Sequence, residues 1–138
     1  MTNFVGHHLN ISHGFLSTVD YANTLGANFM QIFLSNPQKY GGNRRSSSEL
    51  KELNKKLIDN NMKMVIHASY KLNFCNPEDS FIHKAAIKDL VNNLDDSVKI
   101  GAIGVVIHMG KNVKNLNLTE DEAISNYVKG IKTALKQH

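Results

Sequence analysis

The chain has 138 residues, the length of one domain, and can bury roughly two-thirds of the surface that it exposes when unfolded. Hydrophobic residues account for 41% and charged residues for 20% of the composition, which excludes a disordered chain, and no apolar run approaches the ~20 residues of a membrane span. The net charge of +4 is compatible with a polyanionic partner.

Two strands and two helices are predicted in the first half of the chain. Residues 4–6 and 29–33 are short apolar runs typical of strands. A helix should begin near Phe15 and end at Gly26, and the next should begin at Ser46, because Ser46 and Glu49 fit a capping box. The expected buried faces are Phe15, Val19, Ala22 and Leu25 in the first helix and Leu50, Leu53, Leu57 and Ile58 in the second.

The second half repeats the alternation. Residues 64–67 and 105–108 are aliphatic runs that each end in a histidine. Asn76 is the predicted cap of the third helix, which should end at Gly101, and Thr119 with Glu122 forms a second capping-box pattern before the fourth. The expected buried faces are Ile87, Leu90, Val91, Leu94 and Val98 in the third helix and Ala123, Tyr127, Val128, Ile131 and Leu135 in the fourth.

Alternation of strands and helices with short connections implies an α/β fold of parallel strands with helical crossovers. Two architectures satisfy it: half of a (β/α)8 barrel, which needs ~250 residues when complete, and a small open doubly wound sheet. In both, the loops that follow the strands gather at one edge. His67 and His108 then stand at the tips of strands about 4.8 Å apart, where two imidazoles can share one metal ion.

The loops at this edge carry an unusual set of side chains. Five of the seven histidines fall there, together with tyrosines and basic residues: His7, His8, His13, His67, His108, Tyr40, Tyr70, Lys39, Arg44 and Arg45. Every Asp and Glu falls in a predicted helix or its first turn, so we expect no carboxylate at the edge. A cationic edge with aromatic side chains favours phosphate or nucleic acid as the ligand.

Several of these loop motifs occur together in one known family. They are Gly6-x-His8 with Gly14, Asn36, His67-x-x-Tyr70-x-x-Asn73, Asn76-Pro77, Lys99-Ile100-Gly101 and the strand that ends in His108. In these motifs the chain resembles endonuclease IV, the zinc-dependent family of apurinic/apyrimidinic endonucleases with a TIM-barrel fold. The resemblance covers the whole chain and reaches the family's first half. It implies a parallel (β/α)4 unit, the first half of a (β/α)8 barrel, as one partial-barrel domain over residues 1–138.

The resemblance also implies an activity. It is hydrolysis of the phosphodiester 5′ of an abasic site in double-stranded DNA with three zinc ions, one of them held by His67 and His108. By the same resemblance, the DNA-binding residues are His8, Asn10, Gln38, Lys39, Tyr40 and Tyr70. The family's remaining Glu, Asp and His ligands belong to the second half of its barrel, so these 138 residues supply ligands for at most one zinc ion.

Two other interpretations stay open. One is a non-catalytic half barrel that binds DNA or a partner, and the other is a sugar isomerase-like barrel, which shares a similar metal-bearing layout. A half barrel leaves its first and fourth strands as open edges, which predicts self-association or pairing with a complementary C-terminal half. Cys75 is the single cysteine and the first residues lack a secretory signal, so we expect a reducing intracellular compartment and no membrane partner.

Overall fold

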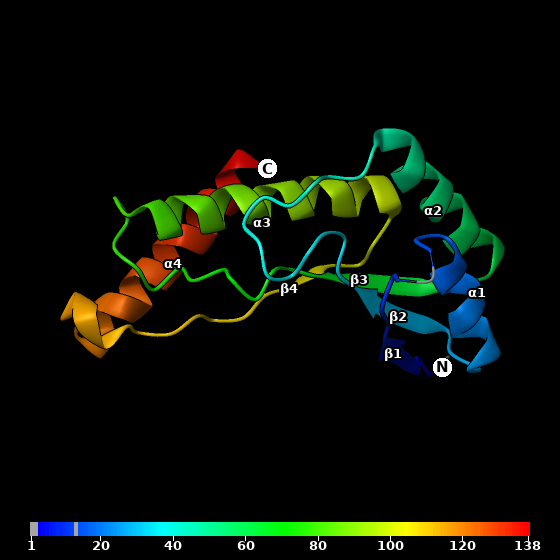
Figure 1. The fold of residues 1–138 in the computed structure, drawn as a ribbon, viewed down its shortest axis with the longest axis horizontal. Helices are drawn as coiled ribbons and strands as arrows, with labels where there is room; N and C mark the ends of the chain where they lie inside the picture. The colour runs from blue at the N-terminus through cyan, green and yellow to red at the C-terminus, as the bar shows by residue number, and fades with distance from the viewer. Residues whose placement is uncertain (1–2, 13) are drawn as a thin grey trace.

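The computed structural model describes residues 3–12 and 14–138, which form a parallel four-stranded sheet with helices packed against it (Figure 1). The elements are β1 (Gly6–His8), α1 (Ser17–Thr24), β2 (Phe29–Ile32), α2 (Ser47–Asp59), β3 (Lys63–His67), α3 (Phe81–Ile100), β4 (Val105–Val106), a 3-10 turn (Lys114–Leu116) and α4 (Glu120–Gln137). The strands lie in the order β1-β2-β3-β4. Because this order has no reversal, it matches successive units of a (β/α)8 barrel and not a doubly wound sheet. Among the residues described, no helix is long and apolar enough to cross a membrane.

The register of the strands gives the sheet two different faces. Side chains alternate along a strand, and the register pairs Met30 with Met64 on one face. That face is covered by helices, and its side chains are fully buried: Met30, Ile32, Met64 and Ile66. On the opposite face Val65 is only half-buried and Val106 is exposed. This open face is the one that turns toward the axis in a closed barrel.

The first and last strands differ from the prediction. β1 covers residues 6–8 instead of 4–6, because pairing begins where Gly6 lies against Phe29. A Cβ on Gly6 would lie 1.9 Å from the carbonyl oxygen of Phe29, so this close approach requires glycine. Phe4 and Val5 precede the ladder and are exposed. β4 keeps two of its four predicted residues, and the chain leaves the ladder before His108.

Both predicted capping boxes are confirmed. The Glu49 N–H donates to the Ser46 hydroxyl at 3.2 Å, and the Ser46 N–H donates to the Glu49 carboxylate at 2.9 Å. Thr119 and Glu122 repeat the arrangement at α4, with distances of 3.2 and 2.8 Å. Gly101 ends α3 with a φ of 72°, a left-handed conformation that favours glycine.

The predicted start of α3 is wrong. The helix begins at Phe81, and its cap is Ser80, whose hydroxyl accepts from the His83 N–H at 3.2 Å. Asn76 is buried in the preceding turn, where its side-chain amide donates to the Asn73 carbonyl at 3.3 Å. The segment between Asn76 and Ser80 is a separate turn, closed by the Ser80 N–H and the Pro77 carbonyl.

The predicted buried faces of the helices are too wide. Five apolar residues at the margins of the helical stripes are exposed: Leu25, Ile58, Val98, Val128 and Leu135. Each helix touches the rest of the molecule along a narrower strip than its apolar pattern covers. The inner positions of the stripes are buried or half-buried, as predicted.

Candidate functional site

Three imidazole rings lie in a row where the first, third and fourth strands end. The ring centroids of His67 and His108 are 5.1 Å apart, and those of His67 and His8 are 5.3 Å apart. Phe33 packs beside this row, at 4.7 Å from both His8 and His67. Tyr70 packs next to Phe33, with ring centroids 5.0 Å apart, and lies 5.4 Å from His67 and 5.3 Å from His108. The structure therefore brings together the two histidines predicted to share a metal ion.

One ring nitrogen of His67 is already committed. Its Nδ1 lies 2.7 Å from the carbonyl oxygen of Ala68, and because a carbonyl can only accept, Nδ1 carries the proton. The Nε2 atom is left with a free lone pair, which is the form of imidazole that binds a metal ion. His67 is buried while His108 is exposed. Within residues 3–12 and 14–138, no group of three or more His, Cys, Asp or Glu side chains is placed to hold a metal ion.

His8 has a different environment from His67. Its Nδ1 lies 2.7 Å from the side-chain nitrogen of Gln31, a donor, so the neutral ring carries its proton on Nε2. Burial, and secondarily the neighbouring His67 ring, lower the pKa of His8. His8 is therefore held neutral with an N–H to donate. His7, one residue earlier, is exposed and lies on the other face of the strand, and His13 lies outside the described residues.

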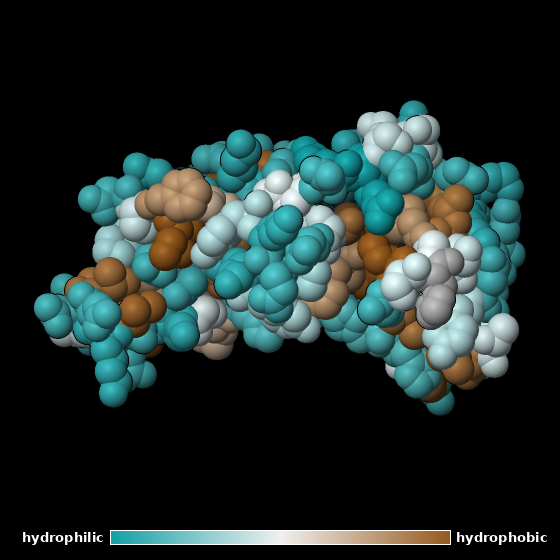
Figure 2. Space-filling model, viewed as in Figure 1, coloured by the Kyte–Doolittle hydropathy of each residue, from teal (hydrophilic) through white to brown (hydrophobic). Residues whose placement is uncertain are grey.

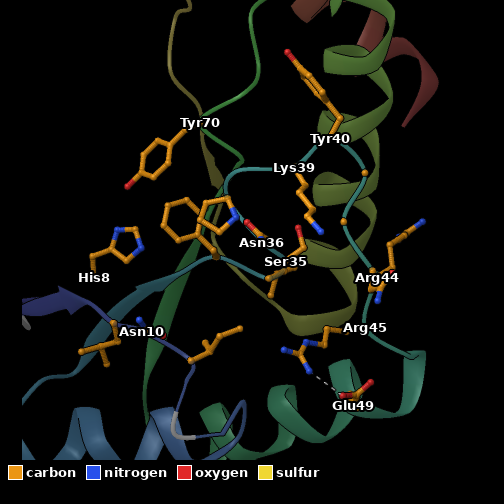
Figure 3. Close-up of a pocket in the computed structure, with 18 residues that line it drawn as sticks. His8, Asn10, Ser35, Asn36, Lys39, Tyr40, Arg44, Arg45, Glu49 and Tyr70 are labelled. Atoms are coloured by element: carbon orange, nitrogen blue, oxygen red, sulfur yellow. Dashed lines mark hydrogen bonds and ion pairs between the residues drawn. The ribbon is translucent and has the colours of Figure 1, made fainter.

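A groove of about 1050 Å³ opens beside the histidine row, between the β1–α1 loop and the β2–α2 loop (Figures 2 and 3). Five of the six predicted DNA-binding residues line it: His8, Asn10, Lys39, Tyr40 and Tyr70. Gln38 is exposed and is not among the lining residues. The wall nearest α2 is formed by Arg45, whose guanidinium stacks 4.5 Å from the centre of the Phe15 ring and pairs with Glu49 at 3.3 Å. The groove is thus basic and aromatic, as the sequence predicts.

A second groove of about 690 Å³ lies between the β3–α3 and β4–α4 loops, on the other side of Tyr70. Lys71, His108 and Lys111 line it, and both tyrosines, Tyr40 and Tyr70, border the two grooves. The two loops are joined by Asn73, whose side-chain amide pairs with both backbone groups of Lys111: the Lys111 N–H donates to Oδ1 at 3.2 Å, and Nδ2 donates to the Lys111 carbonyl at 2.9 Å. Asn73 therefore fixes the segment that carries His108.

The expectation of an edge without carboxylates is wrong. Glu49 lines the larger groove, and two acidic residues of α3, Asp89 and Asp96, bond to the β2–α2 loop. Arg44, predicted as part of the basic loop, is paired with Asp96. The sequence places these acidic residues in helices, but it does not indicate that their side chains face the β2–α2 loop and the groove.

Comparison with known proteins places this geometry in a family. The family model described as a xylose isomerase-like TIM barrel matches residues 19–138. The chain belongs to this family. A relative from Acanthamoeba polyphaga mimivirus, named as an endonuclease 4, is 47% identical over 99% of this chain and 45% of its own length. The chain thus spans about half the length of the curated relatives it matches.

Solved structures confirm that this chain has a TIM-barrel-like fold. Endonuclease IV from Thermus thermophilus superimposes with a TM-score of 0.77 at 22% identity, over 96% of this chain and 47% of that one. D-psicose 3-epimerase, solved in the presence of D-fructose, superimposes with a TM-score of 0.67 at 16% identity, over 96% and 49%. The fold therefore does not separate the nuclease from the sugar-enzyme interpretation. The relatives named endonuclease 4 confirm the resemblance carried by the loop motifs.

Proposed function

We propose that this chain supplies half of the site of a zinc-dependent endonuclease that hydrolyses the phosphodiester 5′ of abasic sites in double-stranded DNA. The proposal depends above all on the adjacent rings of His67 and His108, 5.1 Å apart beside a basic, aromatic groove. The name of the mimivirus relative, an endonuclease 4, points to the same chemistry. A basic groove with tyrosines suits DNA better than it suits an uncharged sugar.

The donor set fits a zinc ion in part. Imidazole is a common zinc ligand, and the hydrogen bond from His67 Nδ1 to Ala68 is the kind of support that orients ligating histidines. Two imidazoles give two of the four positions of a tetrahedral site. A zinc ion held by His67 and His108 would supply Lewis-acid stabilisation of the negative charge on the reacting phosphate. By the family resemblance, further ligands would be Glu, Asp and His residues of the second half of the barrel.

The remaining groups position the DNA. Lys39 and Arg45 border the larger groove and would attract backbone phosphates. Tyr70 stands beside the histidine row with its ring half exposed, where an unstacked sugar or a neighbouring base can pack on it. His8 can donate its Nε2–H to a phosphate oxygen. An abasic nucleotide is cheaply extruded toward such a site because it has no base pair to break.

Metal content tests the ligand pair. His67→Ala and His108→Ala should each lower the affinity for zinc at least tenfold, as measured by titration calorimetry and elemental analysis. His7→Ala is the matched control, because His7 is an exposed histidine that lies outside the row. Equal zinc binding by all three variants would refute the assignment.

Assays on duplex DNA with one abasic site separate the possible functions. With two ligands in the described residues, we expect the 138-residue chain to bind this duplex, to prefer it over intact duplex, and to leave it uncut. Adding a chain that contains the second half of a family barrel should restore incision on the 5′ side. Competition by a ketohexose instead of DNA would favour the isomerase interpretation.

The open edges of the sheet support a proposal about assembly. β4 ends the sheet with Val106 exposed, and Ile103, two residues before β4, is 62% exposed. Exposed edge strands pair readily with other chains. We expect the isolated 138 residues to self-associate or to pair with a complementary half. A monodisperse monomer in light scattering that binds no dye for apolar surface would refute this expectation.

A further inference from the structure

The β2–α2 loop, residues 33–46, is fastened to the side of α3. Arg44 donates from Nε and Nη2 to the carboxylate of Asp96, and from Nη1 to the side-chain oxygen of Asn92 at 2.9 Å. Three residues earlier in the loop, the Gly41 N–H donates to Asp89 at 3.3 Å. The space between loop and helix is about 20 Å³, room for about one water molecule. The loop therefore rests directly on the helix.

The residues of α3 that line the space next to the loop form one stripe at helical spacing: Asp89, Asn92, Asn93 and Asp96. The two carboxylates are 6% and 4% exposed, although Asp is rarely buried without a partner. Asn93 donates to Asp89 at 3.3 Å, and Lys99 lies 3.5 Å from Asp96. Burial raises the pKa of Asp89, and the hydrogen bond to Asp96 raises the pKa of Arg44. A pair of buried acids is costly in a helix unless each carboxylate has a partner, and here the loop supplies a partner to both.

The loop residues divide into two groups by direction. Arg44 and Lys39 both border the larger groove, but Figure 3 shows Arg44 turned away from His8 and Tyr70, toward the far side of the loop, whereas Lys39 projects into the groove. Lys39 is exposed and has no ion pair within the described part of the chain. Arg44 would have to leave a buried carboxylate to reach a phosphate, and among the described residues that carboxylate would then keep only Lys99 as a partner.

We propose that the α3 stripe positions the β2–α2 loop for nucleic acid, and that Arg44 is a positioning residue and not a phosphate contact. The identity of the ligand rests on the proposed function. The stripe holds the two ends of the segment from Gly41 to Arg44, and thereby sets where Lys39 and Tyr40 enter the groove. Ordering the loop before DNA arrives removes the entropy cost of ordering it on binding.

Neutralising Asp96 distinguishes positioning from simple electrostatics. Asp96→Asn removes a negative charge near a polyanion, so charge alone predicts tighter binding to DNA. Loss of the loop's anchor predicts weaker binding. Asp95→Asn is the matched control, because Asp95 is the adjacent residue, pairs with His138 instead of the loop, and loses the same charge.

The first experiment measures binding of these variants to a duplex with one abasic site over a range of salt concentrations. Asp96→Asn should weaken binding about tenfold, the loss expected when a charge-assisted hydrogen bond no longer orders the loop, while Asp95→Asn should not weaken it. Lys39→Gln should lower the slope of log K against log salt by about 1, and Arg44→Gln should weaken binding with the slope unchanged. Equal effects of the two Asp variants, or a lower slope for Arg44→Gln, would overturn the proposal.

The second experiment needs no DNA. Hydrogen exchange of the amides in residues 36–46 should accelerate in Asp96→Asn and Arg44→Gln and stay unchanged in Asp95→Asn. Asp89→Asn, which retains an acceptor for the Gly41 N–H, should keep the Gly41 amide protected, and Asp89→Ala should not. Unchanged exchange rates in every variant would refute the claim that these contacts hold the loop against α3. If the wild-type protein does not bind the abasic duplex, both the proposed function and the role of the loop in DNA binding are refuted. Hydrogen exchange would still test whether the α3 stripe holds the β2–α2 loop in place.

Discussion

Gly110→Ala is expected to disturb the site from a distance, because Gly110 lies where the β4–α4 loop meets Asn73. Gly110 has a φ of 87°, and a Cβ at this position would lie 2.3 Å from Oδ1 of Asn73. That oxygen is the acceptor for the Lys111 N–H, and the same side chain donates to the Lys111 carbonyl. An alanine methyl group therefore displaces Asn73 and releases the segment next to His108.

The magnitude follows from a matched glycine. Gly26 has a φ of 71° but open space around the position of its Cβ, so Gly26→Ala carries the backbone cost alone, roughly 1–2 kcal/mol. Gly110→Ala adds the loss of two hydrogen bonds worth about 0.5–1.5 kcal/mol each, which gives about 2–5 kcal/mol in total. For a domain of this size each kcal/mol lowers Tm by roughly 3–5 °C.

Thermal and urea unfolding of the two variants give the comparison, and zinc titration gives a second measurement. Gly110→Ala should be the less stable variant and should also bind zinc more weakly, because His108 lies two residues away. Gly26→Ala should bind zinc as the wild type does. Equal destabilisation of the two variants would show that Asn73 is not constrained as described.

Three further predictions concern stability. Thr119→Ala should lower the stability by about 1 kcal/mol in thermal unfolding, because the hydroxyl that accepts from the Glu122 N–H is lost. Thr119→Asp should retain most of the wild-type stability, because its carboxylate can accept the same hydrogen bond. Phe74→Ala should cost about 3–5 kcal/mol in urea unfolding, because this ring is fully buried against α4. Burial raises the folded pKa of Asp89, so its ionisation lowers stability as the pH rises from the ordinary Asp value, about 3.9, through the raised pKa. The Asp89→Asn variant should therefore become more stable relative to wild type across that pH window and keep this advantage above it. A constant difference in stability from pH 3 to pH 7 would contradict a raised pKa of Asp89.

Local patterns were enough to predict much of the fold. The two capping boxes, the glycine at the end of α3 and the inner positions of the helical stripes are set by contacts within a few residues, and the structure confirms them. The error at Asn76 has a tertiary cause: its side chain is taken up by a buried turn, so the cap passes to Ser80. The role of Asp89 and Asp96 depends on where the β2–α2 loop lies, which no local pattern specifies. Their spacing of seven residues, with two asparagines between, is a polar stripe that could have signalled a contact.

The site itself depends on strand register, and register explains why these particular side chains meet. His67 pairs with Val106, the last residue of β4, and the chain then leads directly to His108, whose ring lies 5.1 Å from that of His67. His8 pairs with Gln31, and Gln31 pairs with Val65, which puts His8, Gln31 and His67 on one face of the sheet. A slip of one residue in any of these pairs would send the imidazole into the layer of Met64 and Ile66 beneath the helices. The face that carries the histidines is the face that the helices leave open, so the same register that buries the core brings these imidazoles to the grooves.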